Sequence, residues 1–286
     1  MSLGPSDIRS LSSVEANLNY LIPISEKPFR YTYEPPAGVP VDNASYAPHR
    51  TRIHDARPVA AKVSLDQEGF ALIEHRSSVV NFYDEDEVRN VYYPEAEALL
   101  LKATGATKVR VFDHIVRRRP EDRPPLELGR PSSSAVRGPV GRVHNDFTDR
   151  SGPTRLRLEL AAEAERWLVR RFAIVNVWRA IRAPILDAPL AVCDASSVEF
   201  DDLIASDLIY RHRTGETYQV RHNPRHRWFY ISALKADEAL LLKTYDSAED
   251  GRARFAVHSA FEDPTAPPDA PPRESIEVRA FVFYPE

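Results

Sequence analysis

Residues 173–179, Ala-Ile-Val-Asn-Val-Trp-Arg, are the stretch from which the fold is best inferred. β-Branched and aromatic residues favour the pleated sheet, so this stretch predicts a strand. Stretches of similar character, separated by turn residues, recur at 62–65, 70–74, 108–116, 143–147, 218–221, 228–231, 239–245, 255–258 and 275–284. Many short strands with few helices favour a mainly β fold, a sandwich or barrel with flanking helices.

Helices are expected at only a few places. In residues 94–104, Pro94 stands in the first turn, acidic residues follow it, and Gly105 comes directly after the segment. This order of residues predicts a helix. Residues 159–171 place apolar side chains at helical spacing and predict a second helix.

The N-terminal residues 1–60 are rich in proline, which interrupts regular elements. We expect an arm that wraps around the rest of the molecule, with a short helix over 13–19 capped by Ser13. The length suits one large domain. We therefore expect a single domain over 1–286, with its core and helices in 61–286.

The composition excludes several functional classes. A formal charge of −4 gives no electrostatic basis for binding nucleic acid. The first residues, MSLGPSDIRSLSS, lack a basic segment followed by an apolar core. No apolar stretch reaches the roughly 18 residues that span a bilayer, so we expect no membrane partner and a cytoplasmic location. Cys193 is the sole cysteine, which rules out an intramolecular disulfide or a thiolate cluster.

A metal-binding pattern stands at His144-Asn145-Asp146. Residues i and i+2 of a strand point to the same side, so His144 and Asp146 project together. His258 ends a later apolar strand and supplies a second imidazole. Two histidines and one carboxylate are the ligands of mononuclear non-haem Fe(II) oxygenases. Each residue alone is weak evidence, because His-x-Asp arises by chance and a lone strand histidine is usually a core residue.

Arg273-Glu274-Ser275 follows His258 at a short distance in the sequence. Arg273 and Ser275 share a strand face, where the guanidinium offers a planar fork for a carboxylate and the hydroxyl adds a hydrogen bond. This pair predicts the anchor for a 2-oxoglutarate carboxylate. Arg279 has the same alternation parity and is the rival anchor if the strand register is shifted.

At these residues the chain resembles the Fe(II)/2-oxoglutarate-dependent oxygenase superfamily. It is similar in particular to the branch with the cephamycin 7α-methoxylation protein, gibberellin desaturase-like proteins and aspergillic-type hydroxylase/desaturases. The stretches that carry the likeness are 143–148, 174–179, 189–194, 227–230, 242–247 and 258–261. They extend over nearly the whole chain, and the resemblance implies a double-stranded β-helix (jelly-roll) core.

The resemblance also implies roles for individual residues. His144, Asp146 and His258 become the iron ligands, and Arg273 with Ser275 the anchors of 2-oxoglutarate. Asp146 stands where halogenating relatives have a small residue, which argues against halogenation. The implied activity is an Fe(II)- and 2-oxoglutarate-dependent oxidation of a small-molecule, secondary-metabolite substrate by dioxygen, with release of succinate and CO2. Hydroxylation, desaturation and cyclisation all stay open, as do the substrate and the oligomeric state.

Four further residues are candidates near such a site. Asn176 and Trp178 share a strand face with Arg179 on the other, and the three are candidates for the substrate pocket. The alternative is a strand end with Arg179 in an ion pair. Tyr245 is a candidate hydrogen-bond partner of 2-oxoglutarate, and the alternative is a tyrosine that packs in the sheet.

The most basic segments are 211–213 and 221–227. His222 and His226 have the spacing of helical metal ligands, but Pro224 between them argues against a helix. A surface hairpin is the simpler interpretation. The alternative is a patch that steers a carboxylate-bearing substrate.

Two other functions stay open at the level of sequence. A non-haem Fe(II) oxidase on the same scaffold would keep the three ligands but would not depend on Arg273. A catalytically silent jelly-roll binding protein would bind a metabolite without iron.

Overall fold

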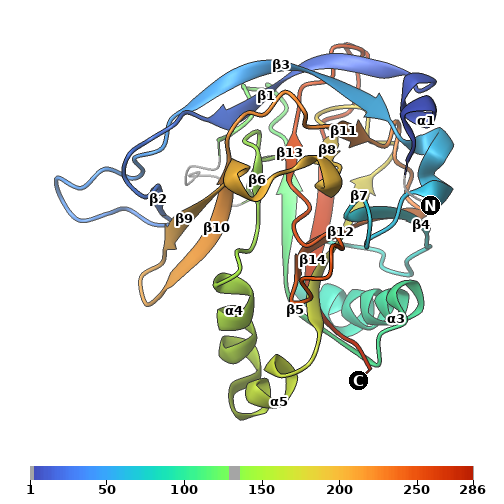
Figure 1. The fold of residues 1–286 in the computed structure, drawn as a ribbon. Helices are drawn as coiled ribbons and strands as arrows, with labels where there is room; N and C mark the ends of the chain where they lie inside the picture. The colour runs from blue at the N-terminus through green and yellow to red at the C-terminus, as the bar shows by residue number, and fades with distance from the viewer. Residues whose placement is uncertain (1–2, 129–135, 286) are drawn as a thin grey trace.

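The computed structural model describes residues 3–128 and 136–285. This part of the chain forms two curled sheets (Figure 1). The larger has nine strands in the order β1 (Ser13–Leu21), β3 (Tyr46–Asp55), β11 (Trp228–Tyr230), β8 (Leu190–Cys193), β13 (His258–Ala260), β6 (His144–Asn145), β10 (Thr214–Val220), β9 (Leu203–Ile209) and β2 (Phe29–Tyr31). The smaller has five, in the order β4 (Phe70–Glu74), β12 (Glu238–Asp246), β7 (Phe172–Arg182), β14 (Glu274–Phe283) and β5 (Lys108–Arg118).

A hydrophobic core fills the space between the two sheets. Tyr218 and Val220 of the larger sheet belong to the same buried cluster as Ile174 and Phe281 of the smaller. A second cluster covers the outer face of the smaller sheet, where helix α3 (Tyr93–Thr104) packs. The central strands of that sheet are therefore buried on both faces, which explains their nearly continuous apolar sequences.

The helices lie outside the sheets (Figure 1). Helix α3 is where the sequence predicts it, and Gly105 ends it at φ 67° in the left-handed region that favours glycine. The single helix predicted at 159–171 is wrong. The chain forms α4 (Ser151–Leu160) and α5 (Ala164–Leu168), because Ala161 adopts φ 46° and breaks the helical path between them.

The remaining helical segments are short. They are α1 (Pro5–Arg9), α2 (Glu85–Glu87), the π-helix η2 (Val88–Tyr92) and the 3-10 helices η1 (Arg57–Lys62), η3 (Ala161–Glu163), η4 (Ala195–Ser197) and η5 (Phe200–Asp202). The strand predicted at 62–65 is wrong, since η1 ends there and an irregular segment follows. Among the described residues, no helix has the length and apolarity needed to cross a membrane.

The N-terminal segment is not an arm without regular elements. The helix predicted at 13–19 is wrong, because these residues belong to β1, which pairs antiparallel with β3. Buried residues alternate along β1 at Val14, Ala16, Leu18 and Tyr20, the two-residue period of a half-buried strand. Pro48 lies inside β3 opposite Asn19, so proline does not prevent pairing there.

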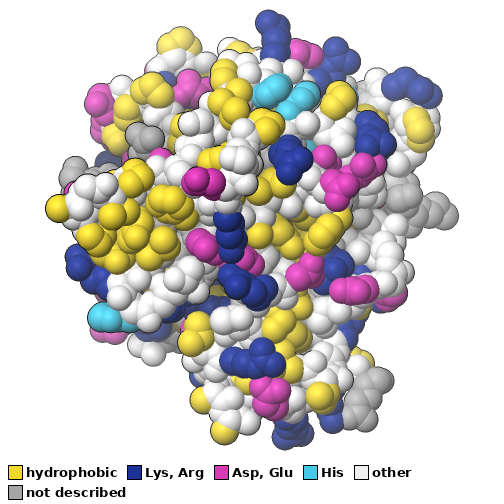
Figure 2. All heavy atoms as spheres, turned by 60° about the vertical axis from the view of Figure 1, so that its left-hand side comes forward, with side chains coloured by type: hydrophobic (Ala, Val, Ile, Leu, Met, Phe, Trp, Pro, Cys, Tyr) yellow, Lys and Arg dark blue, Asp and Glu magenta, His cyan; other side chains and the backbone are white. Residues whose placement is uncertain are grey.

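This architecture brings two central strands together across the core. Strand β6 lies between β13 and β10 in the larger sheet, and β14 lies between β7 and β5 in the smaller. On the face shown in Figure 2, basic and acidic side chains are scattered, and hydrophobic side chains gather in a patch at the left of the view. The polar residues that line the interior are gathered where β6 faces β14.

Candidate active site

Two histidines face each other from neighbouring strands. His144 on β6 is the register partner of His258 on β13, and their ring centroids are 4.5 Å apart. Both side chains are buried. Asp146 follows β6 directly, and its Oδ1 lies 3.7 Å from Nε2 of His144. One ligand atom from each of the three residues lies within 4.8 Å of the others, so the group could hold a metal ion.

Backbone carbonyl groups fix the orientation of both imidazole rings. Nδ1 of His144 donates to the Arg142 carbonyl at 2.9 Å, and Nδ1 of His258 donates to the Ala256 carbonyl at 2.8 Å. A carbonyl oxygen can only accept, so each Nδ1 carries the proton and each Nε2 keeps its lone pair for a metal. Such outer hydrogen bonds are what orients metal-binding histidines.

The carboxylate of Asp146 is held by two donors from the smaller sheet. Asn176 on β7 donates to it at 2.8 Å, and Nε of Arg279 on β14 lies 3.1 Å from the same oxygen. Burial alone would raise the pKa of Asp146, but Arg279 and the two histidines lower it well below its usual range. Burial and the neighbouring His258 lower the pKa of His144. Both residues are therefore held in the forms that bind a metal, an anion and a neutral imidazole.

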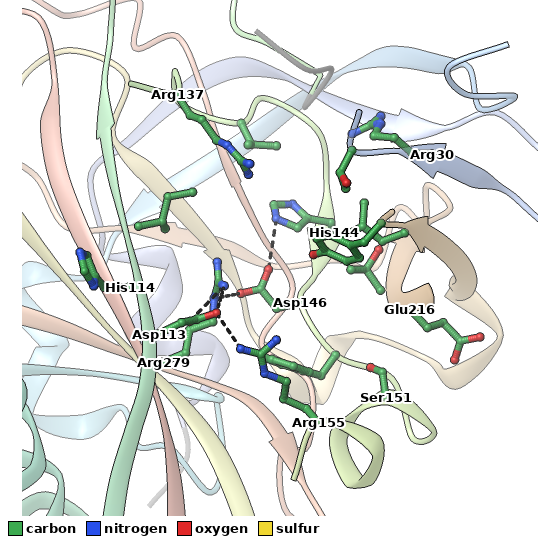
Figure 3. A pocket seen from close by; sticks show the side chains of 18 of the residues that line it. Arg30, Asp113, His114, Arg137, His144, Asp146, Ser151, Arg155, Glu216 and Arg279 are labelled. Atoms are coloured by element: carbon green, nitrogen blue, oxygen red, sulfur yellow. Dashed lines mark hydrogen bonds and ion pairs between the residues drawn. The ribbon is translucent and has the colours of Figure 1, made fainter. Parts of the chain in front are cut away.

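Arg279 belongs to a network of charges. It lies 3.2 Å from Asp113 on β5 and 3.2 Å from Glu277 on its own strand. Asp113 in turn pairs with Arg155 of α4, as the dashed lines in Figure 3 show. Burial favours the neutral form of Arg279, but Asp113, Asp146 and Glu277 outweigh it and raise its pKa. The charge of Arg279 is thus fully engaged by protein carboxylates.

Arg273 has a different environment at the other end of the same strand. Its guanidinium donates to the Ser275 hydroxyl at 3.1 Å and to the Ala188 carbonyl at 2.8 Å, and lies 4.9 Å from the centre of the Trp178 ring. No carboxylate among the described residues forms an ion pair with this side chain. Burial and the nearby Arg117 lower the pKa of Arg273 to about 9, although the charges of Glu277 and Asp187 act in the opposite direction. A buried cation whose hydrogen bonds reach only neutral groups is costly, and an incoming carboxylate would lower that cost.

The other predicted site residues divide into two groups. Asn176 and Trp178 lie on the inner face, bonded to Asp146 and stacked on Arg273. Arg179 points the opposite way, where it donates to the His75 carbonyl at 2.8 Å under Tyr92. It therefore does not line the pocket.

Tyr245 lies apart from Arg273. Its ring packs between Phe172 and Phe255, with centroid distances of 5.1 and 6.4 Å. Tyr245 also presses on Gly152 at the start of α4, where a Cβ would come within 2.6 Å of the ring. Its position is that of a packing residue, the alternative that the sequence left open.

The basic hairpin region is also separate from the metal-binding group. His222 stacks on His49, with centroids 3.9 Å apart, and His226 pairs with Asp202 at 3.1 Å. These contacts hold the loop after β10 against β3 and η5. Cys193 is buried in the core, where burial raises the pKa of its thiol to about 12.

A cavity of about 1050 Å³ opens onto His144, Asp146 and Arg279. Several further arginines and acids line it, including Arg117, Arg142 and Asp113, which the sequence analysis did not single out. Arg142 has the same alternation parity as His144 and Asp146, so that rule would have found it. The acids Asp113 and Glu277 depend on cross-strand register, for which the sequence has no local signal.

Comparisons with known proteins agree with this geometry. Residues 18–283 match the family model described as an oxidoreductase/YMDC permease-like domain. The chain is 36% identical to the hydroxylase/desaturase CTB9 of Cercospora beticola over 254 residues, 84% of this chain and 78% of that protein. It is 34% identical to the Fe(II)/2-oxoglutarate-dependent dioxygenase nvfI of Aspergillus novofumigatus over 260 residues, 88% of this chain and 90% of that one.

The solved structures give the same result for the fold. A variant of the iron and alpha-ketoglutarate-dependent endoperoxidase NvfI matches with a TM-score of 0.87 and 29% identity, covering 97% of this chain and 99% of that one. The chain belongs to the Fe(II)/2-oxoglutarate-dependent oxygenase superfamily. The predicted jelly-roll fold is confirmed, as are the expected cofactor Fe(II) and cosubstrate 2-oxoglutarate.

As a member, this oxygenase is an enzyme that oxidises a small molecule of secondary metabolism with dioxygen. Both alternatives that the sequence left open, an oxidase without 2-oxoglutarate and a silent binding protein, are set aside by this membership. What remains to be assigned is the role of each residue at the site.

Proposed function

We propose that His144, Asp146 and His258 bind the Fe(II) of this oxygenase, and that Arg273 with Ser275 binds the far carboxylate of 2-oxoglutarate. The small-molecule substrate occupies the cavity that opens onto His144 and Asp146. The observation that carries the proposal is the convergence of two oriented imidazoles and one ionised carboxylate on a single point. Bound Fe(II) with 2-oxoglutarate supplies the activation of dioxygen for oxidation of a C–H bond.

The donor set fits Fe(II). Imidazole nitrogen and carboxylate oxygen suit a divalent iron, and three protein ligands leave room for a bidentate cosubstrate and dioxygen. Asn176 and Arg279 hold the Asp146 carboxylate in place and keep it ionised. This supports a ligand group organised before the metal arrives.

The surroundings of Arg273 fit the cosubstrate. Arg273 as a residue is 3% exposed and its guanidinium stacks on Trp178, so little water reaches it. A carboxylate placed there would receive charge-assisted hydrogen bonds from Arg273 and one from the Ser275 hydroxyl. Arg279 is the weaker candidate, because Asp113, Asp146 and Glu277 already surround it.

The reaction outcome follows from how the substrate lies in the cavity. The residues of the cavity wall position the reacting C–H bond, and this placement selects hydroxylation, desaturation or cyclisation. The relatives include proteins named hydroxylase/desaturase and one named endoperoxidase, so the same scaffold supports several outcomes.

An anaerobic titration tests these roles. The protein is titrated with Fe(II) and then with 2-oxoglutarate, and the visible charge-transfer band of the iron–cosubstrate complex is recorded. Wild type should develop the band, and His144→Ala should not. His222→Ala is the matched control, since His222 lies outside the metal-binding group, and it should behave as wild type. A full band in His144→Ala would overturn the ligand assignment.

A further inference from the structure

A second unpaired guanidinium lies beside the metal-binding group. Arg142 precedes His144 by two residues on the same strand path, so its side chain projects to the same side as those of His144 and Asp146. It lines the cavity that opens onto both residues. Its side chain is nevertheless largely buried, with 7% of the residue exposed.

The hydrogen bonds of Arg142 reach only neutral groups. Nε donates to Oε1 of Gln219 at 3.1 Å, and Nη1 donates to the Leu128 carbonyl at 3.0 Å. Gln219 also accepts from the Tyr46 hydroxyl at 3.1 Å, so its oxygen is shared. Nη2 has no hydrogen-bond partner among the described residues. One edge of the guanidinium thus remains available to a molecule in the cavity.

The positively charged neighbours of Arg142 favour the binding of an anion beside it. Arg30 and Arg117 line the same cavity as Arg142. Arg117, on β5, donates to the Gly138 carbonyl and is itself without a carboxylate ion pair in the described chain. Figure 3 shows Arg30 and Arg137 projecting into the cavity from the side of His144, away from Arg155 and Ser151.

None of the acids that line the cavity forms an ion pair with Arg142. Asp113 pairs with Arg155 and Arg279, and Glu216 pairs with Lys27 and Arg150. Glu127 lies against Gly138 and forms no ion pair with Arg142 or Arg117. Arg142 and Arg117 therefore have no carboxylate ion pair in the described part of the chain, beside the proposed metal-binding group.

We infer that Arg142 binds a carboxylate of the primary substrate, so that this oxygenase acts on an organic acid. The inference rests on the proposed function, because it places the substrate next to His144 and Asp146. A carboxylate on the free edge of Arg142 would orient the rest of the molecule toward the metal-binding group. The space of about 1050 Å³ accommodates a carbon skeleton of metabolite size beyond that contact.

Calorimetric titration with matched acids and amides tests the inference. The probes are 2-naphthylacetate and decanoate, each compared with its primary amide. The protein is loaded with Zn(II) in place of Fe(II) and saturated with 2-oxoglutarate, so that Arg273 is already occupied. At least one acid should bind wild type more tightly than its amide, and Arg142→Gln should weaken that acid roughly 10- to 100-fold without changing the amide.

Two further variants control the measurement. Arg150→Gln removes an arginine of the same cavity that is exposed and paired with Glu216, and it should leave the acid affinity within about twofold of wild type. Arg142→Lys keeps the charge without the fork and should give an intermediate affinity.

The outcomes separate this inference from the proposed function. Arg142→Gln should keep the charge-transfer band with Fe(II) and 2-oxoglutarate, which shows that the protein is folded and that its cosubstrate site is intact. Equal binding of acids and amides, or an unchanged acid affinity in Arg142→Gln, would overturn the inference. Acid binding that disappears when 2-oxoglutarate is saturating would also overturn it, because the probe would then be occupying the cosubstrate site.

Discussion

Arg273, which directly precedes β14, and Arg279 within it project to the same side of the sheet, yet their surroundings are opposite. Arg279 is surrounded by Asp113, Asp146 and Glu277 and is held as part of a charge network. Arg273 contacts a hydroxyl, a carbonyl and the face of Trp178. Burial lowers the pKa of Arg273, whereas carboxylates raise that of Arg279.

The difference indicates that the two arginines have different roles. A paired cation can hold a metal-binding carboxylate in position but has no charge left for a ligand. An unpaired buried cation destabilises the empty site and gains from an incoming anion. Partners, more than position in the sequence, therefore distinguish Arg279, which holds Asp146, from Arg273, which we propose binds the cosubstrate.

The largest expected effect comes from removing the carboxylate between the two histidines. Asp146→Ala should abolish stoichiometric binding of Fe(II) and all turnover, because two imidazoles alone leave the metal without its anionic ligand. Direct titration with Fe(II) measures this. Asp149→Ala, which removes a nearby carboxylate paired with Arg254, should bind iron normally.

The next effect concerns the paired arginine. Arg279→Met should lower the free energy of unfolding of the metal-free protein by about 3 kcal/mol, because it leaves buried carboxylates without a cation. Urea denaturation of the variant and wild type measures the change. An Arg279→Met protein as stable as wild type would show that the network contributes nothing to the fold.

A smaller effect is expected at the neutral donor to the metal group. Asn176→Ala removes the hydrogen bond to Asp146 and should weaken Fe(II) binding by roughly 10-fold. The affinity for 2-oxoglutarate at saturating iron should stay unchanged, since Asn176 does not touch Arg273. An unchanged iron affinity would remove Asn176 from the group of positioning residues.

The smallest expected effect is an increase in stability. Arg273→Met should raise the free energy of unfolding of the metal-free protein by about 1 kcal/mol, because it removes a buried charge that has only neutral partners. The same denaturation series gives the value. A loss of stability as large as that of Arg279→Met would mean that the two arginines are structurally equivalent.

Much of the fold could be predicted from hydrophobic pattern. Strands β7 and β12 are buried on both faces, so their sequences are rich in consecutive apolar residues. Strand β1 is missed because Ser13 is interpreted as a helix cap, although the residues after it have the two-residue alternation of a strand. Strand β6 has only two residues, and pairing with β10 and β13 defines it more than its own composition does.

Those residue pairs of the site that follow from the alternation of side chains along a strand could be predicted from the sequence. The rule that i and i+2 share a face relates His144 to Asp146 and Arg273 to Ser275, and the structure brings each pair together. Alternation could not separate Arg273 from Arg279, which have the same parity. That separation depends on the register of β14 with β5, which sets Arg279 opposite Asp113. Register of this kind arises from the whole sheet and has no local signal.

The most direct test of the division between the two arginines is the dissociation constant of 2-oxoglutarate for Arg273→Gln and Arg279→Gln, each read from the charge-transfer band at saturating Fe(II). We expect Arg273→Gln to weaken 2-oxoglutarate roughly 100-fold, the effect of losing a buried charge-assisted pair. Arg279→Gln should require more iron but then bind 2-oxoglutarate as wild type does. The reverse pattern, with 2-oxoglutarate binding lost in Arg279→Gln and retained in Arg273→Gln, would contradict the assignment.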